Sequence, residues 1–484
     1  MDNSVNEMFS ILGDIPFKTF MLELFLECEE RGLPAWCLRI THLYLMLTKY
    51  NTVYTAKPFC IELLDFIKFS INDSLLNKQI ELDFNNAAPL SSFLMSNELL
   101  QLPKLMIVKI LKYIERDTRG QSNNPIWHMV RQNSITASKV FNIYLQKKID
   151  IPDSATRYCS DAVNSGLKHE KIIKCMLQKY VTKEDVTHGD NIGLLLDPSS
   201  CILGASLDFC SGLGIDNSGL LIMKKKISIY EIKFRHKYLK EKNDPLLINL
   251  LTNCSEEAFA SFILSHCKPA IDYRTPGSLP AAQEYLMSYN EIYKPIKKLR
   301  TCAAPELLLG DIKKQISINE KEKSIVILFG HTEETYTLRG EVLKKLHVFE
   351  KKRLTVDVFI NPKHKYYYQS ILQHYVMTKF FIYDNTDSIN DSQNAPELNI
   401  VSAIFRKKDP DEFSFVVNDI EYTEEEIPVL LIITPIKIDP FFTSNIITEV
   451  YHTWETDIEK STNLQAWVPN AVREFQDLYS QKVT

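Results

Sequence analysis

Three charged residues in the middle of the chain have types and a spacing that could do chemistry. Glu231 and Lys233 stand two residues apart at the end of the apolar run SGLLIMKKKISIYEIKFR. In a strand their side chains therefore point to the same side. Upstream, GASLDF places Asp208 just before CSGLG, which we interpret as a turn, so that the two acids would meet across a hairpin. Two carboxylates beside an ammonium group suit a magnesium ion that shares its shell with phosphate.

Such an ion can lower the pKa of a bound water and stabilise the charge on a leaving oxygen. Lys233 could orient the attacking water or stabilise a charged phosphorane. Each residue also has a simpler reading. A Glu-x-Lys pair on an exposed strand is commonly a solvated ion pair, and an isolated Asp such as Asp208 is most often a turn residue.

A second stretch, GQSNNPIWHMVRQNSITAS, spans residues 120–138 and has two compatible interpretations. In the structural one, Trp127 lies in the core and Thr136 or Ser138 caps the following helix. In the functional one, hydroxyl and free N–H groups at a helix start bind phosphate, and Arg131 holds it through two hydrogen bonds.

A third stretch, NSGLKHEKIIKCMLQKY, places Glu170 ahead of an apolar helical face. An acid in the first turn of a helix is favoured by the helix dipole alone. Glu170 is thus either a dipole-stabilising glutamate or a further member of the acidic group.

The elements that must position these residues follow from the hydrophobic pattern. Three helical segments, 17–32, 35–50 and 102–120, predict an N-terminal helical lobe over residues 1–115. From there to residue 484 we expect a core and C-terminal lobe. CILGASLDFCSGLGI and SGLLIMKKKISIYEIKF predict paired strands, KSIVILF, TVDVFINP and KFFIYDN further strands, and KHKYYYQSILQHYVM a helix. This mixture predicts an α/β (α+β) fold with a central mixed sheet flanked by helices.

Composition excludes several classes of protein. The net charge of −5 over 484 residues excludes a globally basic nucleic-acid coat, so any nucleic acid would occupy a local basic groove. Ten cysteines without CxxC or zinc spacing suit a reducing compartment, the cytosol or nucleus. We expect no signal peptide and no membrane span, and the chain has neither a GxxxxGK[ST] phosphate loop nor a GxSxG elbow.

In chain order these motifs resemble the lambda-exonuclease-like branch of the PD-(D/E)XK nucleases. The segments TRGQSNNPIW, GASLDF, EIKFR and INPKHKYYYQ are similar to those of the herpesvirus alkaline nuclease family. Within that family it is most similar to gammaherpesvirus members, of the murine type, that combine host shutoff with exonuclease activity. The motifs cover about residues 118–385, and the resemblance implies a restriction-endonuclease-like core.

By carry-over, the resemblance assigns roles residue by residue. The catalytic set is Glu170, Asp208, Glu231 and Lys233, of which the three acids would hold the metal. The substrate-binding set, for phosphate and its surroundings, is Gln121, Arg131, Thr136, Ser138, Ser206 and Gln369, with Gln373 as the alternative to Gln369. One departure is a longer gap between Asp208 and Glu231, which contains Lys224–Lys226; these lysines either face the substrate or form a solvated strand.

The resemblance implies a Mg²⁺-dependent alkaline nuclease in which Mn²⁺ can substitute. It would degrade linear double-stranded DNA from 5′ ends during viral genome processing and cut host mRNA internally, through attack by a metal-activated water. We expect a monomer that binds DNA, mRNA and host RNA-decay factors in the host nucleus and cytoplasm. The alternatives are a DNA-only exonuclease and a non-catalytic binding protein on a nuclease scaffold. The intact acids argue against the last.

Overall fold

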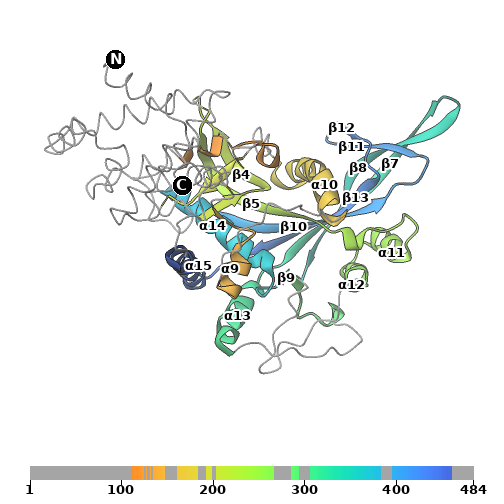
Figure 1. Cartoon of the computed structure of the whole chain (residues 1–484). Helices are drawn as coiled ribbons and strands as arrows, with labels where there is room; N and C mark the ends of the chain where they lie inside the picture. The colour runs from red at the N-terminus through yellow and green to blue at the C-terminus, as the bar shows by residue number, and fades with distance from the viewer. Residues whose placement is uncertain are drawn as a thin grey trace, which may run out of the picture.

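The structure is a computed structural model of the whole chain (Figure 1). It describes residues 111–147, 161–183, 192–265, 285–293, 306–382 and 395–460, apart from gaps at 113, 117, 125–126, 128–130, 132–133, 199–202 and 218. The expected helical lobe over 1–115 lies almost wholly outside the described residues. None of the described helices combines the length and apolar character needed to span a bilayer.

The helices and strands have the following bounds. The helices are α9 (Val140–Gln146), α10 (Asp161–Leu177), α11 (Pro245–Asn253), α12 (Glu256–Leu264), α13 (Glu306–Asn319), α14 (Lys365–Ile382) and α15 (Pro440–Lys460). The strands are β1 (Ile135–Thr136), β2 (Leu194–Leu196), β3 (Leu203–Ser206), β4 (Phe209–Ile215), β5 (Leu221–Phe234), β6 (Leu286–Met287), β7 (Ser324–Leu338), β8 (Glu341–Val356), β9 (Phe359–Ile360), β10 (Glu397–Lys407), β11 (Glu412–Val417), β12 (Ile420–Tyr422) and β13 (Glu426–Ile436).

An eight-stranded mixed sheet forms the centre, in the order β12-β11-β8-β7-β13-β10-β5-β4. β5 runs parallel to β10 and antiparallel to β4, while β13 runs antiparallel to both β10 and β7. β1, β2 and β3 form a small second sheet beside it. The predicted fold class, a mixed sheet flanked by helices, is confirmed.

Strand periodicity divides the core between the two faces of the sheet. Ile327 and Phe329 of β7 pack in the same cluster as α10, whereas Val326 and Leu328 pack with α11 and α12 on the other face. Figure 1 shows α10 and the α11–α12 pair on opposite sides of the sheet. Tyr230 and Ile232 of β5 belong to the α10 cluster. Glu231 therefore faces away from α10, as the alternation of a strand requires.

Three local expectations are wrong. CSGLG is part of β4, and the hairpin turns instead between β4 and β5, where the Asp216 carbonyl accepts from Gly219 and the Asp216 side chain from Leu220. In the expected strand KFFIYDN, residues 379–382 are the last turn of α14, because the apolar pattern of that helix continues through Phe380 and Phe381. Residues 383–385 of that strand lie outside the described part of the chain.

The helix expected to start at ITAS begins later. Ile135 and Thr136 form β1, which pairs in parallel with β3 at Leu203 and Gly204. β-branched residues such as these pack well in a strand. Lys139 stands at the N-cap of α9 and makes no side-chain capping hydrogen bond, so the helix-cap interpretation of Thr136 and Ser138 is wrong.

Candidate active site

Glu231 and Lys233 meet near the carboxyl end of β5, as predicted from their spacing. Lys233 Nζ donates to Glu231 Oε1, and Glu231 is only 1% exposed. The ammonium group also lies 4.7 Å from the ring centroid of Tyr366 on α14, a cation–π contact. A solvated surface ion pair is therefore excluded for this Glu-x-Lys.

Asp208 sits in the short break between β3 and β4. The register of β4 on β5 pairs Phe209 with Tyr230, which brings Asp208 alongside the end of β5. Its Oδ2 accepts a hydrogen bond of 2.8 Å from the backbone N–H of Ile232, the residue between Glu231 and Lys233. The predicted meeting of both acids and the lysine is thus present in the structure.

The electrostatics of this group are unbalanced. Burial and the neighbouring Glu231 charge raise the pKa of Asp208 to about 8, against the opposing effect of Lys233. Burial alone would lower the pKa of Lys233, but the charges of Glu231 and Asp208 outweigh burial and raise it. One lysine therefore does not neutralise two carboxylates that share a desolvated site.

Glu170 lies in the interior of α10, not in its first turn, because the helix already begins at Asp161. Its Oε1 forms an ion pair with Lys174 Nζ, one helical turn further on, at a distance of 2.7 Å. The Glu170 charge also contributes to raising the pKa of Asp208, so it acts on the same site. The dipole interpretation of Glu170 fails, and its carboxylate, ion-paired with Lys174, acts on the acidic group through its charge.

Two glutamines on α14 hold the carboxylate of Glu231. Gln369 Nε2 donates to Oε1 at 2.6 Å, and Gln373 Nε2 donates to Oε2 at 2.5 Å. Gln373 also lies 3.3 Å from the carbonyl oxygen of Ser206. Gln369 and its alternative Gln373 thus both act, because residues four apart share one helix face.

The predicted phosphate-binding residues gather next to this site. Ser206 Oγ accepts from Trp127 Nε1 at 2.9 Å and lies 3.5 Å from Arg131. Arg131 stacks 4.3 Å over the Trp127 ring and reaches Ser138 at 3.4 Å. The hydroxyls of Thr136 and Ser138 are 3.3 Å apart. Because Ser206 lies two residues before Asp208, the guanidinium and hydroxyl groups stand beside the acids.

Gln121 has a different set of partners from the other predicted phosphate ligands. Its Nε2 donates to the carbonyls of Ile192 and Leu207, at 2.9 and 3.0 Å. Leu207 directly precedes Asp208. In this structure Gln121 fixes the backbone that carries the acid, and no hydroxyl or guanidinium group of the phosphate cluster contacts it through a described hydrogen bond.

The fit of a divalent ion rests on Asp208 and Glu231. They offer the hard carboxylate oxygens that Mg²⁺ prefers, and the raised pKa of Asp208 records a negative charge that a cation would relieve. Within the described residues no group of three or more His, Cys, Asp or Glu stands close enough to hold a metal. The pair fits an ion that takes its other ligands from water and phosphate, and Glu170 would join only by leaving Lys174.

Sequence reasoning missed Tyr366 and Trp127 as members of the site. The Tyr366 ring makes a cation–π contact with Lys233. Its position three residues before Gln369, on the same helix face, was the available signal. Trp127 is buried as expected, but its indole N–H binds Ser206. Lys224–Lys226, left open between substrate contact and solvated strand, are exposed, and Lys226 pairs with Glu397 at 2.8 Å.

Comparison with known proteins finds relatives along almost the whole chain. The alkaline nuclease of human herpesvirus 6B (strain Z29) is 38% identical and covers 98% of this chain and 97% of its own. That of human herpesvirus 7 (strain JI) is 40% identical over 93% and 91%. The shutoff alkaline exonuclease of alcelaphine herpesvirus 1 (strain C500) is 28% identical over 76% and 77%. These identities do not favour the narrower gammaherpesvirus resemblance over the family as a whole.

The fold matches a solved nuclease. The crystal structure of the shutoff and exonuclease protein from Kaposi's sarcoma-associated herpesvirus superposes with a TM-score of 0.66 at 23% identity, covering 94% of this chain and 92% of that one. Two further structures of the shutoff and exonuclease protein (SOX), one with RNA and one with DNA, match with TM-scores of 0.65 and 0.64, at 21% and 22% identity. The model of the viral alkaline exonuclease family matches residues 10–472. With its described site and with relatives of 38–40% identity along nearly all of its length, the chain belongs to the viral alkaline exonuclease family.

Proposed function

We propose that the chain is a Mg²⁺-dependent nuclease that degrades linear double-stranded DNA from 5′ ends, in the processing of replicated viral genomes. The observation that carries the proposal is the buried group of Asp208, Glu231 and Lys233, in which burial and the neighbouring Glu231 charge raise the pKa of Asp208 to about 8, so that ionising both acids leaves an excess of negative charge. Such an excess beside a cluster of phosphate donors suits a site that a divalent ion and a phosphodiester complete together.

The residues of the chain divide the work. Arg131, with the hydroxyls of Ser138 and Ser206, binds the phosphate next to the scissile bond. Lys233, held by Glu231 and the Tyr366 ring, donates to the attacking water or to the phosphorane oxygens. Asp208 and Glu231 would hold a Mg²⁺ ion, or Mn²⁺ in its place, which would supply positive charge to lower the pKa of the attacking water and offset charge on the leaving oxygen.

A 5′ phosphate is the group that Arg131 is best placed to recognise. Its guanidinium is oriented by stacking on Trp127, so its donors are held toward the two serine hydroxyls. We expect a preference for 5′-phosphorylated over 5′-hydroxyl ends that falls when Arg131 is replaced by alanine. The ratio of the two cleavage rates measures this preference directly. An unchanged ratio would show that Arg131 does not recognise the 5′ phosphate.

Internal cleavage of mRNA, and through it host shutoff, is the second proposed activity. Attack by water on phosphorus needs no 2′-OH, so one site can hydrolyse either polymer. Relatives named shutoff alkaline exonuclease and the fold shared with a SOX–RNA complex support this activity. Recognition of RNA would depend on its shape and unpaired bases. The proposed mRNA activity would need the protein in the host cytoplasm with RNA-decay factors, and the proposed DNA activity would need it in the nucleus.

One experiment tests both activities. Wild type, Asp208→Asn and Glu231→Gln are compared on 5′-phosphorylated linear duplex DNA and on a structured RNA, in Mg²⁺, Mn²⁺ or EDTA. Glu397→Gln, which alters an exposed ion-paired carboxylate on the same sheet, is the matched control. We expect both activities to vanish in the two site variants and in EDTA, and to persist in the control. RNA cleavage that survives Glu231→Gln would move the RNA activity to another surface, and DNA cleavage that survives would refute the site.

A further inference from the structure

The far ends of β7 and β8 form a two-stranded extension of the sheet, which we call the distal ribbon (residues 331–344). The two strands pair along their whole length, from Ser324–Val356 to Leu338–Glu341. β13 pairs with β7 only between residues 325 and 328, and β11 pairs with β8 only between 344 and 347. Figure 1 shows the ribbon running out from the sheet at the end opposite α9, α14 and α15. Among the described strands, none but β8 pairs with the outer part of β7.

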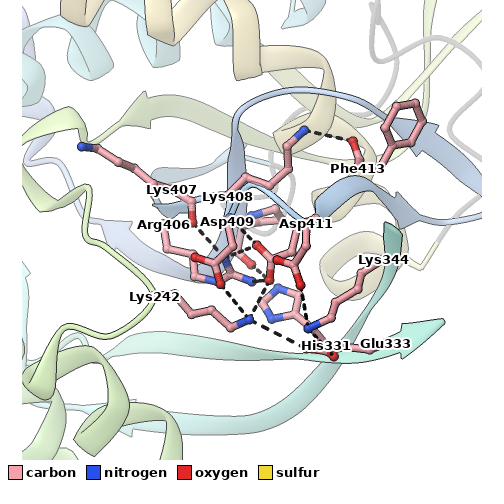
Figure 2. A network of polar contacts seen from close by, with 12 residues as sticks. Lys242, His331, Glu333, Lys344, Arg406, Lys407, Lys408, Asp409, Asp411 and Phe413 are labelled. Atoms are coloured by element: carbon pink, nitrogen blue, oxygen red, sulfur yellow. Dashed lines mark hydrogen bonds and ion pairs between the residues drawn. The ribbon is translucent and has the colours of Figure 1, made fainter. Parts of the chain in front are cut away.

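The root of the distal ribbon is clamped by charged side chains on both faces, and Figure 2 shows the network that contains Glu333 and Lys344. On one face Glu333 lies 3.4 Å from Lys344 and 3.8 Å from Lys242, and Lys344 pairs with Asp411 at 2.9 Å. On the other face His347 bonds Glu334 at 3.0 Å, and Lys345 bonds Glu421 at 2.8 Å. The ribbon therefore leaves the sheet in a fixed direction.

The tip of the ribbon is also preorganised. Its two turn residues, Arg339 and Gly340, both have positive φ, at 53° and 86°. A two-residue turn with this geometry matches the right-handed twist of the flanking strands. The ribbon is thus a prebuilt structural element that presents the outer edge of β7 and, at residues 341–343, a shorter edge of β8.

The middle of the β7 edge lacks the usual protection against pairing, because the charged residues Glu333, Glu334 and Arg339 lie toward its ends. Exposed strand edges normally carry lysine, proline or a bulge, which discourage another strand from adding. Residues 335–338, Thr-Tyr-Thr-Leu, have no charge and no proline and consist largely of residues that favour strands.

Apolar side chains gather at the same end of the sheet. Of the nine large apolar side chains that are exposed in the described residues, five lie on β7, β8, β11 and β12: Leu338, Val342, Phe349, Phe413 and Ile420. Val342, at 64%, is the most exposed of these five. Because Thr337 pairs with Val342, Leu338 and Val342 point to opposite faces of the ribbon, and apolar side chains therefore flank the outer edge of β7 on both sides.

We propose that the outer edge of β7 pairs with the same edge of a second copy of this chain. Two such edges can join in antiparallel fashion around a two-fold axis at Tyr336. This register sets Tyr336 opposite Tyr336, Thr335 opposite Thr337, and the acidic Glu333 opposite the basic Arg339. Tyrosine pairs, threonine pairs and pairs of opposite charge each stabilise adjacent strands. The edge is therefore complementary to itself, as a two-fold interface requires.

The expected dimer is weak, so the chain stays the monomer that the family resemblance implies except at high concentration. About seven residues of strand edge from each copy bury far less than the roughly 1,200–2,000 Å² of a stable interface. Association should appear at high protein concentration and stay reversible. The ribbon extends β7 and β8, which β13 and β10 separate from β5 and its Glu231 in the strand order, so pairing leaves the candidate active site open.

The test uses the full chain in sedimentation equilibrium over a wide concentration range. Wild type should show a monomer–dimer equilibrium. Tyr336→Lys and Tyr336→Glu each place like charges directly opposite one another at the axis, so each variant alone should dimerise about tenfold more weakly or less. An equimolar mixture of the two variants should regain the dimer, because the opposite charges then face each other.

Ile248→Lys is the control, because it charges an exposed apolar position on α11, 47% exposed and remote from the ribbon. It should dimerise as the wild type does. A wild type that stays monomeric at its highest soluble concentration would overturn the proposal. So would dimers that persist unchanged in Tyr336→Lys, because the contact would then lie elsewhere, and so would a mixture that fails to regain what the single variants lose.

Discussion

Two buried glutamates in the same sheet have opposite electrostatic surroundings. Glu231 on β5 and Glu412 on β11 are each 1% exposed. Glu412 accepts two hydrogen bonds of 2.8 Å from Arg406, one of 3.0 Å from Lys242 and one of 2.8 Å from the backbone N–H of Asp409. Glu231 has a single cationic partner, Lys233, and its other donors are the neutral amides of Gln369 and Gln373.

The pKa values follow these surroundings. Burial alone would raise the pKa of Glu412, but hydrogen bonds from Arg406, Asp409 N–H and Lys242 outweigh it and lower the pKa to about 2. At the other site, burial and the Glu231 charge raise the pKa of Asp208 to about 8. The first network is electrostatically complete, whereas the second retains an excess of negative charge. Burial and charge density are thus common to both places, and only the incomplete balance distinguishes the one suited to a cation and a phosphate.

The largest expected effect is on catalysis. Glu231→Gln should lower kcat on DNA by at least about 10³-fold, because it removes a charge that acts on the reacting atoms. The thermal unfolding midpoint should change less than in Glu412→Gln, since Asp208 can ionise and keep a negative charge beside Lys233 when residue 231 is neutral. Glu412→Gln should do the reverse, with lower stability and near-normal kcat for the folded fraction. Equal losses of kcat in the two variants would erase the distinction between the two sites.

The next effect is on stability. Arg406→Met leaves the buried carboxylate of Glu412 without its bidentate partner, and breaking a buried ion pair costs about 3–5 kcal/mol. Urea unfolding measures this loss, and Arg406→Met combined with Glu412→Leu should recover part of it by removing the stranded charge. A double variant no more stable than the single one would show that packing, not charge, holds β10 to β11.

The pH dependence of stability should differ in sign between the two sites. The pKa of Asp208 is higher in the folded than in the unfolded protein, where it is near 3.8, so the folded state binds the extra proton between these values. Stability of the metal-free protein should therefore fall as pH rises through this window toward about 8, and the fall should be smaller in Asp208→Asn.

Glu412 contributes in the opposite direction. Its pKa is lower in the folded protein, so its stabilisation is complete above pH 4.5 and is lost as pH falls toward about 2. Unfolding curves for wild type, Asp208→Asn and Glu412→Gln from acid to alkaline pH separate the two contributions. Parallel curves for wild type and Asp208→Asn at alkaline pH would contradict the raised pKa.

Much of the active site could be predicted from the sequence because its signals are local. The period of two in a strand placed Glu231 and Lys233 on one face, and the family resemblance selected Gln369, with Gln373 as its alternative, on a segment predicted to be helical. The charged network around Glu412 was missed because its members come from four strands and two loops. No spacing along the chain relates Lys242 to Glu412 or Arg406 to Glu412 across the β10–β11 turn; only the register of the folded sheet does.

The failed local predictions have similar causes. Lys379–Ile382 has the composition of a strand, but α14 continues through it because Phe380 and Phe381 find buried positions on the same helix. Ile135 and Thr136 were assigned to a helix start because their pairing with β3, some 68 residues away in the chain, cannot be seen in a local pattern. In both places tertiary packing decided between propensities that the short segments left open.

The smallest effect distinguishes the two glutamines that replace a second cation at Glu231. Each donates one hydrogen bond to the carboxylate, and a bond to a charged group contributes about 1.5–3 kcal/mol, which corresponds to roughly 10- to 100-fold in rate if it acts in the transition state. Gln373 also reaches the Ser206 carbonyl, so Gln373→Leu should disturb the phosphate cluster as well as Glu231. Gln369→Leu should lower kcat alone, while Gln373→Leu should also raise KM for 5′-phosphorylated DNA. If both variants changed only kcat and by the same factor, the link from Glu231 through Gln373 to the phosphate-binding residues would be absent, and the two halves of the site would act independently.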